Sequence, residues 1–249
     1  MTENLFIKND FRIHLICEKR FYSRELQIIF DNPDASLCLA GTPVLQNNFK
    51  SRIGIIEVNG KKLVIKRHNF KSRWQQFKRY FRRTKSSRSW YYSKLLKNNN
   101  VSIPQPVAYI EKRFGPFRGI SYFLYEYVEG IQGEEYFRQL RHSPEKAASA
   151  MASILDTIDA IQSLHLIHGD IRLANFIFNG KKLYLIDFDD VRPRNWYKPH
   201  SMKNRDIRGL RKDICFNAPE TIQNQLLEQI DQYCLRKNIR ISGPNYQNK

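Results

Sequence analysis

The stretch His165–Asp190, which reads HLIHGDIRLANFIFNGKKLYLIDFDD, decides the fold. It predicts, in order, a sharp loop at His168–Asp170, a strand at Phe176–Phe178, a tight turn at Asn179–Gly180 and a returning strand at Leu183–Ile186. Apolar residues dominate both strands, and Asn-Gly is typical of a two-residue hairpin turn. The sequence therefore predicts a loop followed by a β-hairpin.

Three oxygen-bearing side chains lie at the ends of these elements: Asp170, Asn175 and Asp187. Because the hairpin reverses the chain, Asn175 and Asp187 are expected at the same end of it. Phosphoryl transfer uses such a set: one carboxylate orients the attacking hydroxyl, while an amide and a second carboxylate hold Mg²⁺ against the triphosphate. Asp and Asn are also common turn residues, so an ordinary hairpin is the plainer interpretation. The order of loop, turn, second strand and acid favours phosphoryl transfer.

The pattern H-x-D-x-x-x-x-N followed by I-D-F resembles the catalytic loop and metal-binding motif of the protein-kinase-like superfamily. This resemblance implies that Asp170 is the catalytic base and that Asn175 and Asp187 are magnesium ligands. It also places Arg172 where many kinases carry a Lys that faces the transferred phosphate. We therefore expect Arg172 to take part in catalysis.

The composition limits the class of protein. The chain has 249 residues, of which 41% are hydrophobic and 13% aromatic, so it can bury a core in one large domain or two lobes. Its four cysteines lie far apart and form no C-x-x-C pair, so neither a zinc site nor a disulfide framework is indicated. No run of about 18 apolar residues occurs, and we expect neither a membrane span nor a signal peptide.

A second hairpin is predicted upstream, with strands at Ile53–Val58 and Lys61–Arg67 joined by an Asn59–Gly60 turn. Its V-I-K segment looks like the third strand of a kinase small lobe. That likeness implies that Lys66 holds the α- and β-phosphates of ATP. An exposed charge at a strand end is the alternative for this lysine.

Two departures from the protein-kinase pattern occur in the same region. The loop Asn47–Arg52 contains no G-x-G-x-x-G, so polar groups would have to cover the phosphates. No acidic residue lies between Glu57 and Glu111, and the helix predicted at Ser86–Lys97 is among the residues without one. A Lys–Glu ion pair between Lys66 and that helix is therefore impossible.

Basic residues concentrate in residues 61–100, which hold 14 of the 42 Lys and Arg and no acid, in a chain of net charge +18. Within this segment Trp74, Phe77 and Phe81 recur at helical spacing among basic residues. Three interpretations stay open: a packed helix with a solvated charged face, a surface for an anionic membrane or glycolipid, and a nucleic-acid surface.

The segment after residue 119 predicts a buried strand at Ile120–Val128 that ends in Y-E-Y-V-E-G. This ending resembles the kinase hinge, where the C=O of Glu126 and the N–H of Val128 would bind adenine. Helical spacing and end signals then predict four helices: Glu134–Leu140, Pro144–Leu164, Asn204–Cys215 and Glu220–Arg236.

Taken together, the motifs I-K-R, I-P-x-P, F-G-P, E-Y-V-E-G, H-G-D-x-R-x-x-N and I-D-F-D-D-V-R resemble those of the bacterial lipopolysaccharide core kinases, the Kdo/heptose kinase family. The likeness runs from about Arg52 to Arg211. It implies an α+β, bilobal, protein-kinase-like fold, with a small antiparallel-sheet lobe at residues 1–128 and a minimal helical large lobe at residues 129–249. It also implies ATP and Mg²⁺ as cofactors.

The same resemblance implies an acceptor, a partner and a location. The acceptor would be a heptose or Kdo hydroxyl of the lipopolysaccharide core glycolipid, met at the inner face of the cytoplasmic membrane. Residues 61–100 would contact the anionic membrane surface peripherally, with Arg79, Arg82 and Arg83 docking the glycolipid, and nucleic acid is not the expected partner. Two alternatives are a small protein kinase of the type associated with tRNA modification and a catalytically weak kinase-fold adaptor that binds anionic surfaces or nucleic acid.

Overall fold

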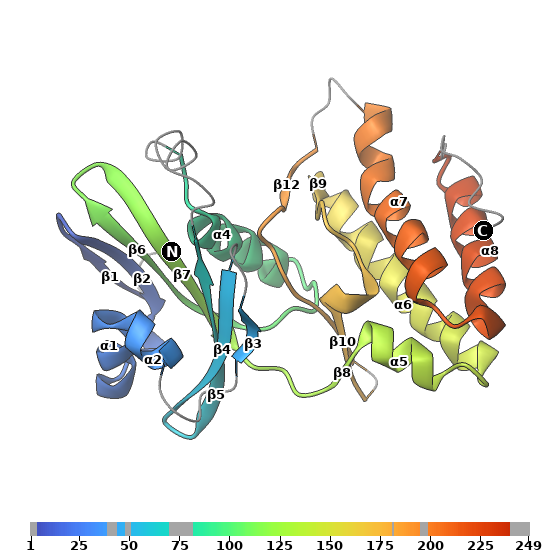
Figure 1. The fold of residues 1–249 in the computed structure, drawn as a ribbon. Helices are drawn as coiled ribbons and strands as arrows, with labels where there is room; N and C mark the ends of the chain where they lie inside the picture. Colours follow the sequence, from blue (N-terminus) through green and yellow to red (C-terminus); the bar gives the residue numbers. More distant parts are fainter. Residues whose placement is uncertain are drawn as a thin grey trace. The chain divides into compact units, whose positions relative to one another are not determined.

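The computed structural model describes residues 4–38, 44–47, 51–69, 82–180, 182–194 and 199–239. The chain divides into two compact units (Figure 1). The first comprises Met1–Leu95 and Pro104–Tyr127, and the second comprises Leu96–Ile103 and Val128–Lys249. Each unit has its own sheet and its own helices, and each is described separately below.

The first unit is built on a seven-stranded antiparallel sheet with the strand order β1-β2-β6-β7-β5-β4-β3. Neighbouring strands are joined by short hairpins where they follow each other in sequence, as in β4 to β5 and β6 to β7. The strands are β1 Leu5–Asn9, β2 Ile13–Glu18, β3 Val44–Asn47, β4 Ser51–Val58, β5 Lys61–His68, β6 Pro106–Phe114 and β7 Phe117–Glu126.

The two faces of this sheet carry different residues, because side chains alternate along a strand. Leu63 and Ile65 of β5 lie in the hydrophobic core on the face covered by α1 (Arg24–Asp31) and α2 (Pro33–Cys38). The alternating residues of β5 therefore point to the opposite face, against which α4 (Lys85–Asn98) packs. A short 3-10 helix, η1 (Lys19–Phe21), connects β2 to the segment before α1.

The predicted β4–β5 hairpin is confirmed. Val58 pairs with Lys61, and the two loop residues Asn59 and Gly60 have φ values of +50° and +70°. Positive φ at both loop positions is the geometry of the type I′ turn that Asn-Gly favours. The hairpin fixes the register of β5, and with it the face of the sheet to which Lys66 points.

The second unit combines four helices with two small sheets in the part of the chain that the structure describes. One sheet has the strand order β11-β10-β8 and the other pairs β12 with β9. The helices are α5 Gly133–Gln139, α6 Pro144–Ser163, α7 Pro199–Asn217 and α8 Glu220–Arg236. The strands are β8 Ile131–Gln132, β9 Leu166–Ile167, β10 Phe176–Asn179, β11 Lys182–Leu185 and β12 Arg192–Pro193, with a 3-10 turn η2 at Leu173–Asn175.

The core of the second unit lies between α6, α7 and α8 (Figure 1). Its buried residues recur at helical spacing on each helix, which is why these segments form amphipathic helices. The prediction of α8 is confirmed at both ends, and α7 begins earlier than predicted. The core side chains include Met151, Leu155, Ile158, Ile207, Leu210, Ile214, Leu226 and Ile230.

Some predicted boundaries are wrong. Most of the I-P-x-P segment precedes the strand, and Pro106 is the first residue of β6, a position at which a strand tolerates proline. The F-G-P motif lies at the tight turn between β6 and β7, where Phe114 pairs directly with Phe117. In the later hairpin Asn179 pairs with Lys182, so the loop begins at Gly180, whose φ is +57°.

Candidate active site

The loop between β9 and η2 carries the first predicted catalytic residue. Gly169 has a φ of +87°, and a Cβ atom at this position would lie 2.9 Å from the carbonyl oxygen of Asp190. Only glycine fits such a conformation and such a close approach without strain. The sharp turn before Asp170 is therefore a consequence of the H-G-D sequence.

Two buried carboxylates on α7 hold the backbone of this loop. Asp206 accepts hydrogen bonds from the N–H groups of His168 and Gly169, at 2.8 and 2.7 Å. Asp213, two turns further along α7, accepts one from the N–H of Leu173 at 2.6 Å. Neither residue was predicted from the sequence. Their signal was the spacing of two acids seven residues apart, which places them on one face of a helix.

Further contacts from α7 fix the same loop. Arg205 donates from Nε to the carbonyl oxygen of Gly169 at 3.0 Å. A Cβ atom on Gly209 would lie 3.0 Å from the carbonyl oxygen of Ile171, so a small residue is needed where the helix passes the loop. The ring of His168 is fully buried and lies edge-on to Phe188, with 6.2 Å between ring centroids.

Burial raises the pKa of Asp206 above the ordinary value for aspartate. This desolvation outweighs the groups that lower the pKa, among which are the His168 ring and the two backbone N–H groups. Burial thus disfavours the charged form of this carboxylate, and the N–H donors of the loop partly offset that cost. Its position is fixed because only that geometry satisfies both of its oxygen atoms.

The structure brings Asp170, Asn175 and the chain at Asp187 to one end of the hairpin. Asn175 donates from Nδ2 to the carbonyl oxygen of Asp170 at 2.7 Å. Its own carbonyl oxygen accepts from the N–H of Ile186 at 2.9 Å, next to Asp187. Asp187 has a φ of +65°, a left-handed conformation that is uncommon for residues other than glycine and that recurs at functional sites.

The donor set of this unit suits a hard divalent cation. Because the Nδ2 atom of Asn175 is engaged by Asp170, its Oδ1 atom is the group left for a ligand. Together with the carboxylate of Asp187 it supplies the oxygen donors that Mg²⁺ prefers. Within the described residues no group of three or more His, Cys, Asp and Glu side chains is arranged to hold a metal.

Arg172 pairs with the carboxylate of Asp170 at 2.8 Å, and both side chains are partly exposed. Next to this pair lies a cavity of about 300 Å³ in the second unit, which contains two more cations, Arg205 and Lys212, and the exposed ring of Phe216. The complete lining is Gly169, Asp170, Ile171, Arg172, Arg205, Gly209, Lys212, Asp213, Phe216 and Asn217. The cavity thus offers positive charge and an aromatic surface beside the Asp170 carboxylate.

In the first unit Lys66 is 5% exposed and lies on β5, opposite Ile53 of β4 and Phe123 of β7. Alternation along β5 points it to the face that α4 covers. Helix α4 presents small hydroxyl residues to this face and contains no acid; Ser86, for example, donates to Ser121 at 3.0 Å. An acidic partner for Lys66 cannot come from this helix, because its sequence contains no Asp or Glu.

The hinge-like segment follows β7, which ends at Glu126. The N–H of Glu126 donates to Gln105 at 2.9 Å, and the N–H of Tyr127 donates to Lys62 at 3.0 Å. The N–H of Val128 makes no hydrogen bond to any described residue. It is therefore a backbone donor that a ligand can use.

Part of the predicted basic segment lies outside the described residues: Trp74, Phe77, Arg79 and Phe81. The same holds for the middle of the loop Asn47–Arg52. Of the proposed glycolipid-docking residues, Arg82 and Arg83 are described and both are exposed.

Comparison with known proteins then decides the family. The model of the lipopolysaccharide kinase (Kdo/WaaP) family matches residues 44–233, which is most of the chain and contains every predicted site residue. The chain belongs to the lipopolysaccharide kinase (Kdo/WaaP) family. The family inferred from the sequence motifs is thereby confirmed, and Asp206 and Asp213 also lie within the matched region.

A solved structure confirms the fold of this lipopolysaccharide kinase family member. The structure, of WaaP in complex with acyl carrier protein, superposes with a TM-score of 0.60 at 17% identity and covers 86% of this chain and 89% of that one. The predicted α+β, protein-kinase-like fold is therefore correct. Within the described residues no helix is both long and apolar enough to cross a membrane.

Two curated relatives are similar over shorter stretches. The probable serine/threonine-protein kinase YbdM of Bacillus subtilis (strain 168) is 29% identical over 138 residues, which are 55% of this chain and 50% of that protein. The dual specificity protein kinase zakA of Dictyostelium discoideum is 34% identical over 73 residues, 26% of this chain and 9% of that protein. The chain thus spans half of the length of the first relative and less than a tenth of the second.

Proposed function

We propose that this lipopolysaccharide kinase family member transfers the γ-phosphoryl group of ATP to a heptose or Kdo hydroxyl of the lipopolysaccharide inner core. One observation carries the proposal: Asn175 joins the Asp170 backbone to the hairpin end that bears Asp187, so a base and two metal-ligand types come from one rigid unit. This is the equipment of phosphoryl transfer in protein kinases.

The chemical roles follow from the side chains. Asp170 accepts the proton of the acceptor hydroxyl as that oxygen bonds to the γ-phosphorus, while the bond from the γ-phosphorus to the bridging oxygen breaks and ADP leaves. Asn175 and Asp187 would hold Mg²⁺, which when bound neutralises charge on the phosphates. Arg172, already paired with Asp170, orients that carboxylate and lies close enough to it to meet the transferred group.

The remaining nucleotide contacts come from the hinge-like segment and β5. We assign Lys66 to the α- and β-phosphates, because alternation along β5 directs both Lys62 and Lys66 to the α4 face and Lys66 is the buried one. The backbone C=O of Glu126 and N–H of Val128 would bind the adenine edge. Loss of nucleotide affinity in Lys66→Met would support the first assignment.

The cavity beside Asp170 supports an acidic acceptor. Arg172, Arg205 and Lys212 line it, and Lys212 also lies 6.0 Å above the ring of Phe216, which is 68% exposed. Guanidinium groups recognise carboxylates and phosphates, and aromatic rings give a sugar an apolar surface to rest on. An acceptor sugar that carries a carboxylate, such as Kdo, fits this lining better than a neutral one.

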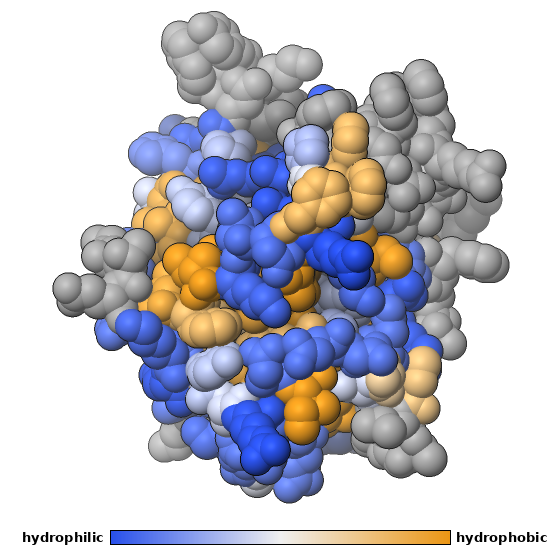
Figure 2. Space-filling model, turned by 90° about the vertical axis from the view of Figure 1, so that its left-hand side faces the viewer, coloured by the Kyte–Doolittle hydropathy of each residue, from blue (hydrophilic) through white to orange (hydrophobic). Residues whose placement is uncertain are grey.

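We assign the site of action to the inner face of the cytoplasmic membrane. The basic residues of the segment 61–100 would be attracted to its anionic lipids. On the face shown in Figure 2 hydrophobic residues form small patches separated by hydrophilic ones. Without one continuous apolar surface on that face, contact there would be electrostatic and peripheral rather than inserted.

Phosphorylation of a protein is the second candidate, because both curated relatives are named protein kinases. Their likeness covers only part of the chain, whereas the lipopolysaccharide kinase model covers residues 44–233. An acceptor panel separates the two candidates directly.

The decisive experiment measures transfer from γ-labelled ATP with Mg²⁺ to core oligosaccharide, to a protein acceptor and to buffer. We expect label in the oligosaccharide and a loss of about 10³-fold in Asp170→Asn, because a general base contributes about 10²–10⁴. Asp156→Asn, an exposed acid on α6, is the matched control and should keep full activity. Label in protein alone, or equal turnover in Asp170→Asn, would overturn the proposal.

A further inference from the structure

A second cavity, of about 370 Å³, lies entirely within the first unit. It opens between the N-terminal half of α4 and the strands β2, β6 and β7. None of its residues is among those assigned above to phosphoryl transfer. The lining is His14, Arg83, Ser87, Trp90, Tyr91, Tyr109, Glu111, Arg113 and Arg118.

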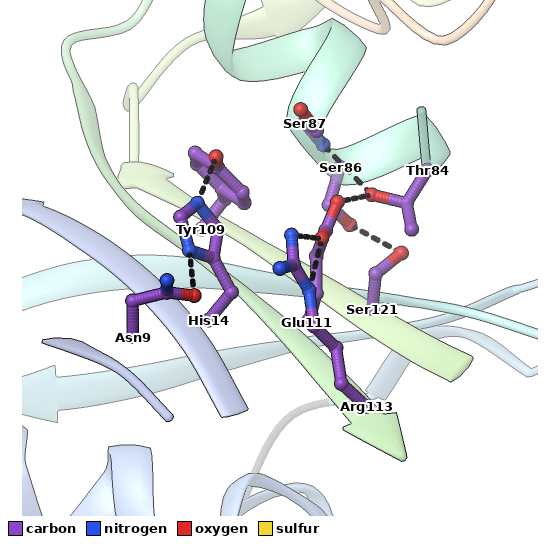
Figure 3. Close-up of polar contacts among 9 residues, drawn as sticks. All are labelled: Asn9, His14, Thr84, Ser86, Ser87, Tyr109, Glu111, Arg113 and Ser121. Carbon is purple, nitrogen blue, oxygen red and sulfur yellow. Dashed lines mark hydrogen bonds and ion pairs between the residues drawn. The ribbon is translucent and has the colours of Figure 1, made fainter. Parts of the chain in front are cut away.

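One guanidinium group of this cavity is held rigidly. Arg113 donates from Nε and Nη2 to the same oxygen of Glu111, at 3.0 and 2.5 Å (Figure 3). Glu111 as a residue is only 1% exposed, and its second carboxylate oxygen accepts a hydrogen bond from the hydroxyl of Thr84 at 2.6 Å. Thr84 in turn accepts from the N–H of Ser87 in the first turn of α4. Helix, carboxylate and guanidinium therefore form one preorganised chain of contacts.

The charge of the lining is not balanced. Three guanidinium groups face one carboxylate, and that carboxylate is already used by Arg113. Arg83 lies over the ring of Tyr91 at 5.7 Å, and the side chain of Arg118 forms no hydrogen bond or ion pair with any described residue. The cavity thus keeps two cations whose charge no described acid neutralises.

The opposite wall is neutral and aromatic. The His14 ring bonds Asn9 and the Tyr109 hydroxyl through its two nitrogen atoms, each at 2.9 Å (Figure 3). Burial, followed by the nearby charge of Arg113, lowers the pKa of His14, so this ring is uncharged near neutral pH. Trp90 packs beside Tyr109 with 5.9 Å between ring centroids. This wall offers rings and one partly exposed hydroxyl-bearing aromatic, Tyr91, rather than further charge.

We propose that this cavity binds the phosphate group of a phosphorylated sugar. Arginine presents planar pairs of N–H donors that match phosphate oxygens, and a preorganised guanidinium loses little entropy on binding. The volume lies at the lower end of the range for small-molecule sites, so there is room for a sugar beside its phosphate. The inference goes beyond phosphoryl transfer, because the cavity uses none of the residues assigned to that reaction; Arg83, predicted from the sequence to dock the glycolipid, is the one lining residue with an earlier assignment.

The phosphate can come from two sources that share this chemistry: a soluble sugar phosphate or the phosphorylated glycolipid itself. Titration calorimetry with glucose 6-phosphate, glucose and inorganic phosphate tests the chemistry. The full chain is used with Mg²⁺ and a saturating non-hydrolysable ATP analogue, so that the nucleotide site is filled. Because no turnover is measured, failure of this inference and failure of the proposed function are distinguishable.

The variants are Arg118→Ala and Arg83→Ala, which remove the two unneutralised cations without leaving a buried partner. We expect each to weaken glucose 6-phosphate binding about tenfold, and the thermal unfolding temperature to stay unchanged. Arg24→Ala, an exposed arginine on α1 at the opposite face of the sheet, is the matched control and should bind as the wild type does. Arg113→Ala is unsuitable, because it would leave Glu111 buried without its cation.

Flotation with phosphatidylcholine vesicles, with and without lipid A, separates the sources. Retention on lipid A vesicles that Arg118→Ala and Arg83→Ala both lose supports the glycolipid as the ligand. Binding of glucose 6-phosphate without vesicle retention supports a soluble ligand. If glucose binds as tightly as glucose 6-phosphate, if neither probe binds, or if both variants bind like the wild type, the proposal is wrong.

Discussion

The two units of this lipopolysaccharide kinase family member bury carboxylates for different purposes. In the first unit Glu18 pairs with Lys94 of α4 and Glu111 pairs with Arg113, so the partners are side chains. In the second unit Asp206 and Asp213 accept from backbone N–H groups of the loop that carries Asp170. The first arrangement ties a helix to a sheet, whereas the second fixes the conformation of a loop.

This difference has an energetic consequence. A side chain that loses its partner can turn toward water, and Arg113 is already 19% exposed. A buried backbone N–H has no such freedom and stays unsatisfied when its acceptor is removed. We therefore expect the acids of the second unit to be the more costly ones to remove, and the predictions below test that ranking.

The largest effect is expected on catalysis in the second unit. If Asp187 is a magnesium ligand, as proposed above, Asp187→Asn should lower kcat about 10³-fold, since it removes a carboxylate that would hold the metal ion at the phosphates. The neighbouring exposed acid Asp190 provides the control, and Asp190→Asn should retain turnover. Steady-state assays with γ-labelled ATP measure both. Comparable losses in the two variants would mean that the loop merely tolerates no charge change.

The next effect is on stability and comes from α7. Asp206→Ala should lower the free energy of unfolding by about 3 kcal/mol, because two buried N–H groups lose their acceptor. Urea denaturation measures the change, with the exposed Glu228→Ala of α8 as a control expected to stay within about 0.5 kcal/mol. A small effect in Asp206→Ala would show that the loop does not depend on this helix.

A smaller loss of stability is expected for the matching substitution in the first unit. Glu111→Ala should cost about 2 kcal/mol, since Arg113 can regain water but the Thr84 hydroxyl loses its acceptor. The double variant Glu111→Ala/Arg113→Ala should recover part of that loss in the same denaturation experiment. If Glu111→Ala proves more costly than Asp206→Ala, the ranking of the two units is reversed.

Each unit contains a buried cysteine whose reaction with a thiol reagent reports on the unfolding of that unit. Burial raises the pKa of Cys17 in the first unit to about 12 and that of Cys234 in the second to about 11. Neither should react with a thiol reagent at pH 8 in the folded protein, whereas the exposed Cys38 should react at once. Labelling across a denaturant series, read by peptide mass, shows which unit opens first. Rapid labelling of Cys17 without denaturant would contradict the burial of its strand.

The smallest effect is a pH dependence. Because the pKa of Asp206 is raised in the folded chain, the folded state binds this proton more tightly than the unfolded state does. As the pH rises from the unfolded pKa through the raised folded pKa, this group should therefore reduce the free energy of unfolding. Asp206→Asn should lack that slope when denaturation is followed upward from pH 4. A wild-type curve parallel to that of the variant would show that Asp206 does not titrate differently on folding.

Local signals in the sequence predicted much of this molecule. The β4–β5 hairpin follows from Asn59–Gly60 between alternating apolar residues, and α8 follows from its apolar spacing. Other features depend on contacts distant in sequence. Asn217 ends α7 and donates to Asp213, while Pro219 takes the cap position of α8. Where α7 ends and α8 begins therefore depends on the contact of Asn217 with Asp213, which forms only in the folded chain.

The candidate site divides in the same way. Asn175 and Asp187 were predicted at the same end of one hairpin, and the N–H of Ile186, next to Asp187, donates to the carbonyl oxygen of Asn175. The roles of Asp206 and Asp213 could not be predicted, since nothing near them in sequence shows which backbone they meet. The strands β1 and β2 and the helices α1 and α2 were also poorly predicted, because their pairing to the rest of the sheet joins residues about a hundred positions apart, as Leu15 and Ile110 show.

The three tethers from α7 have a mechanical consequence. Three residues of one helix, α7, hydrogen-bond to successive backbone groups of the loop: Arg205, Asp206 and Asp213. A rotation of α7 about its axis would therefore lengthen or shorten all of these hydrogen bonds together. The position of the loop that carries Asp170 therefore depends on how firmly α7 packs. A substitution that disrupts the packing of α7, even far from the reacting atoms, should abolish turnover before the rest of the unit unfolds.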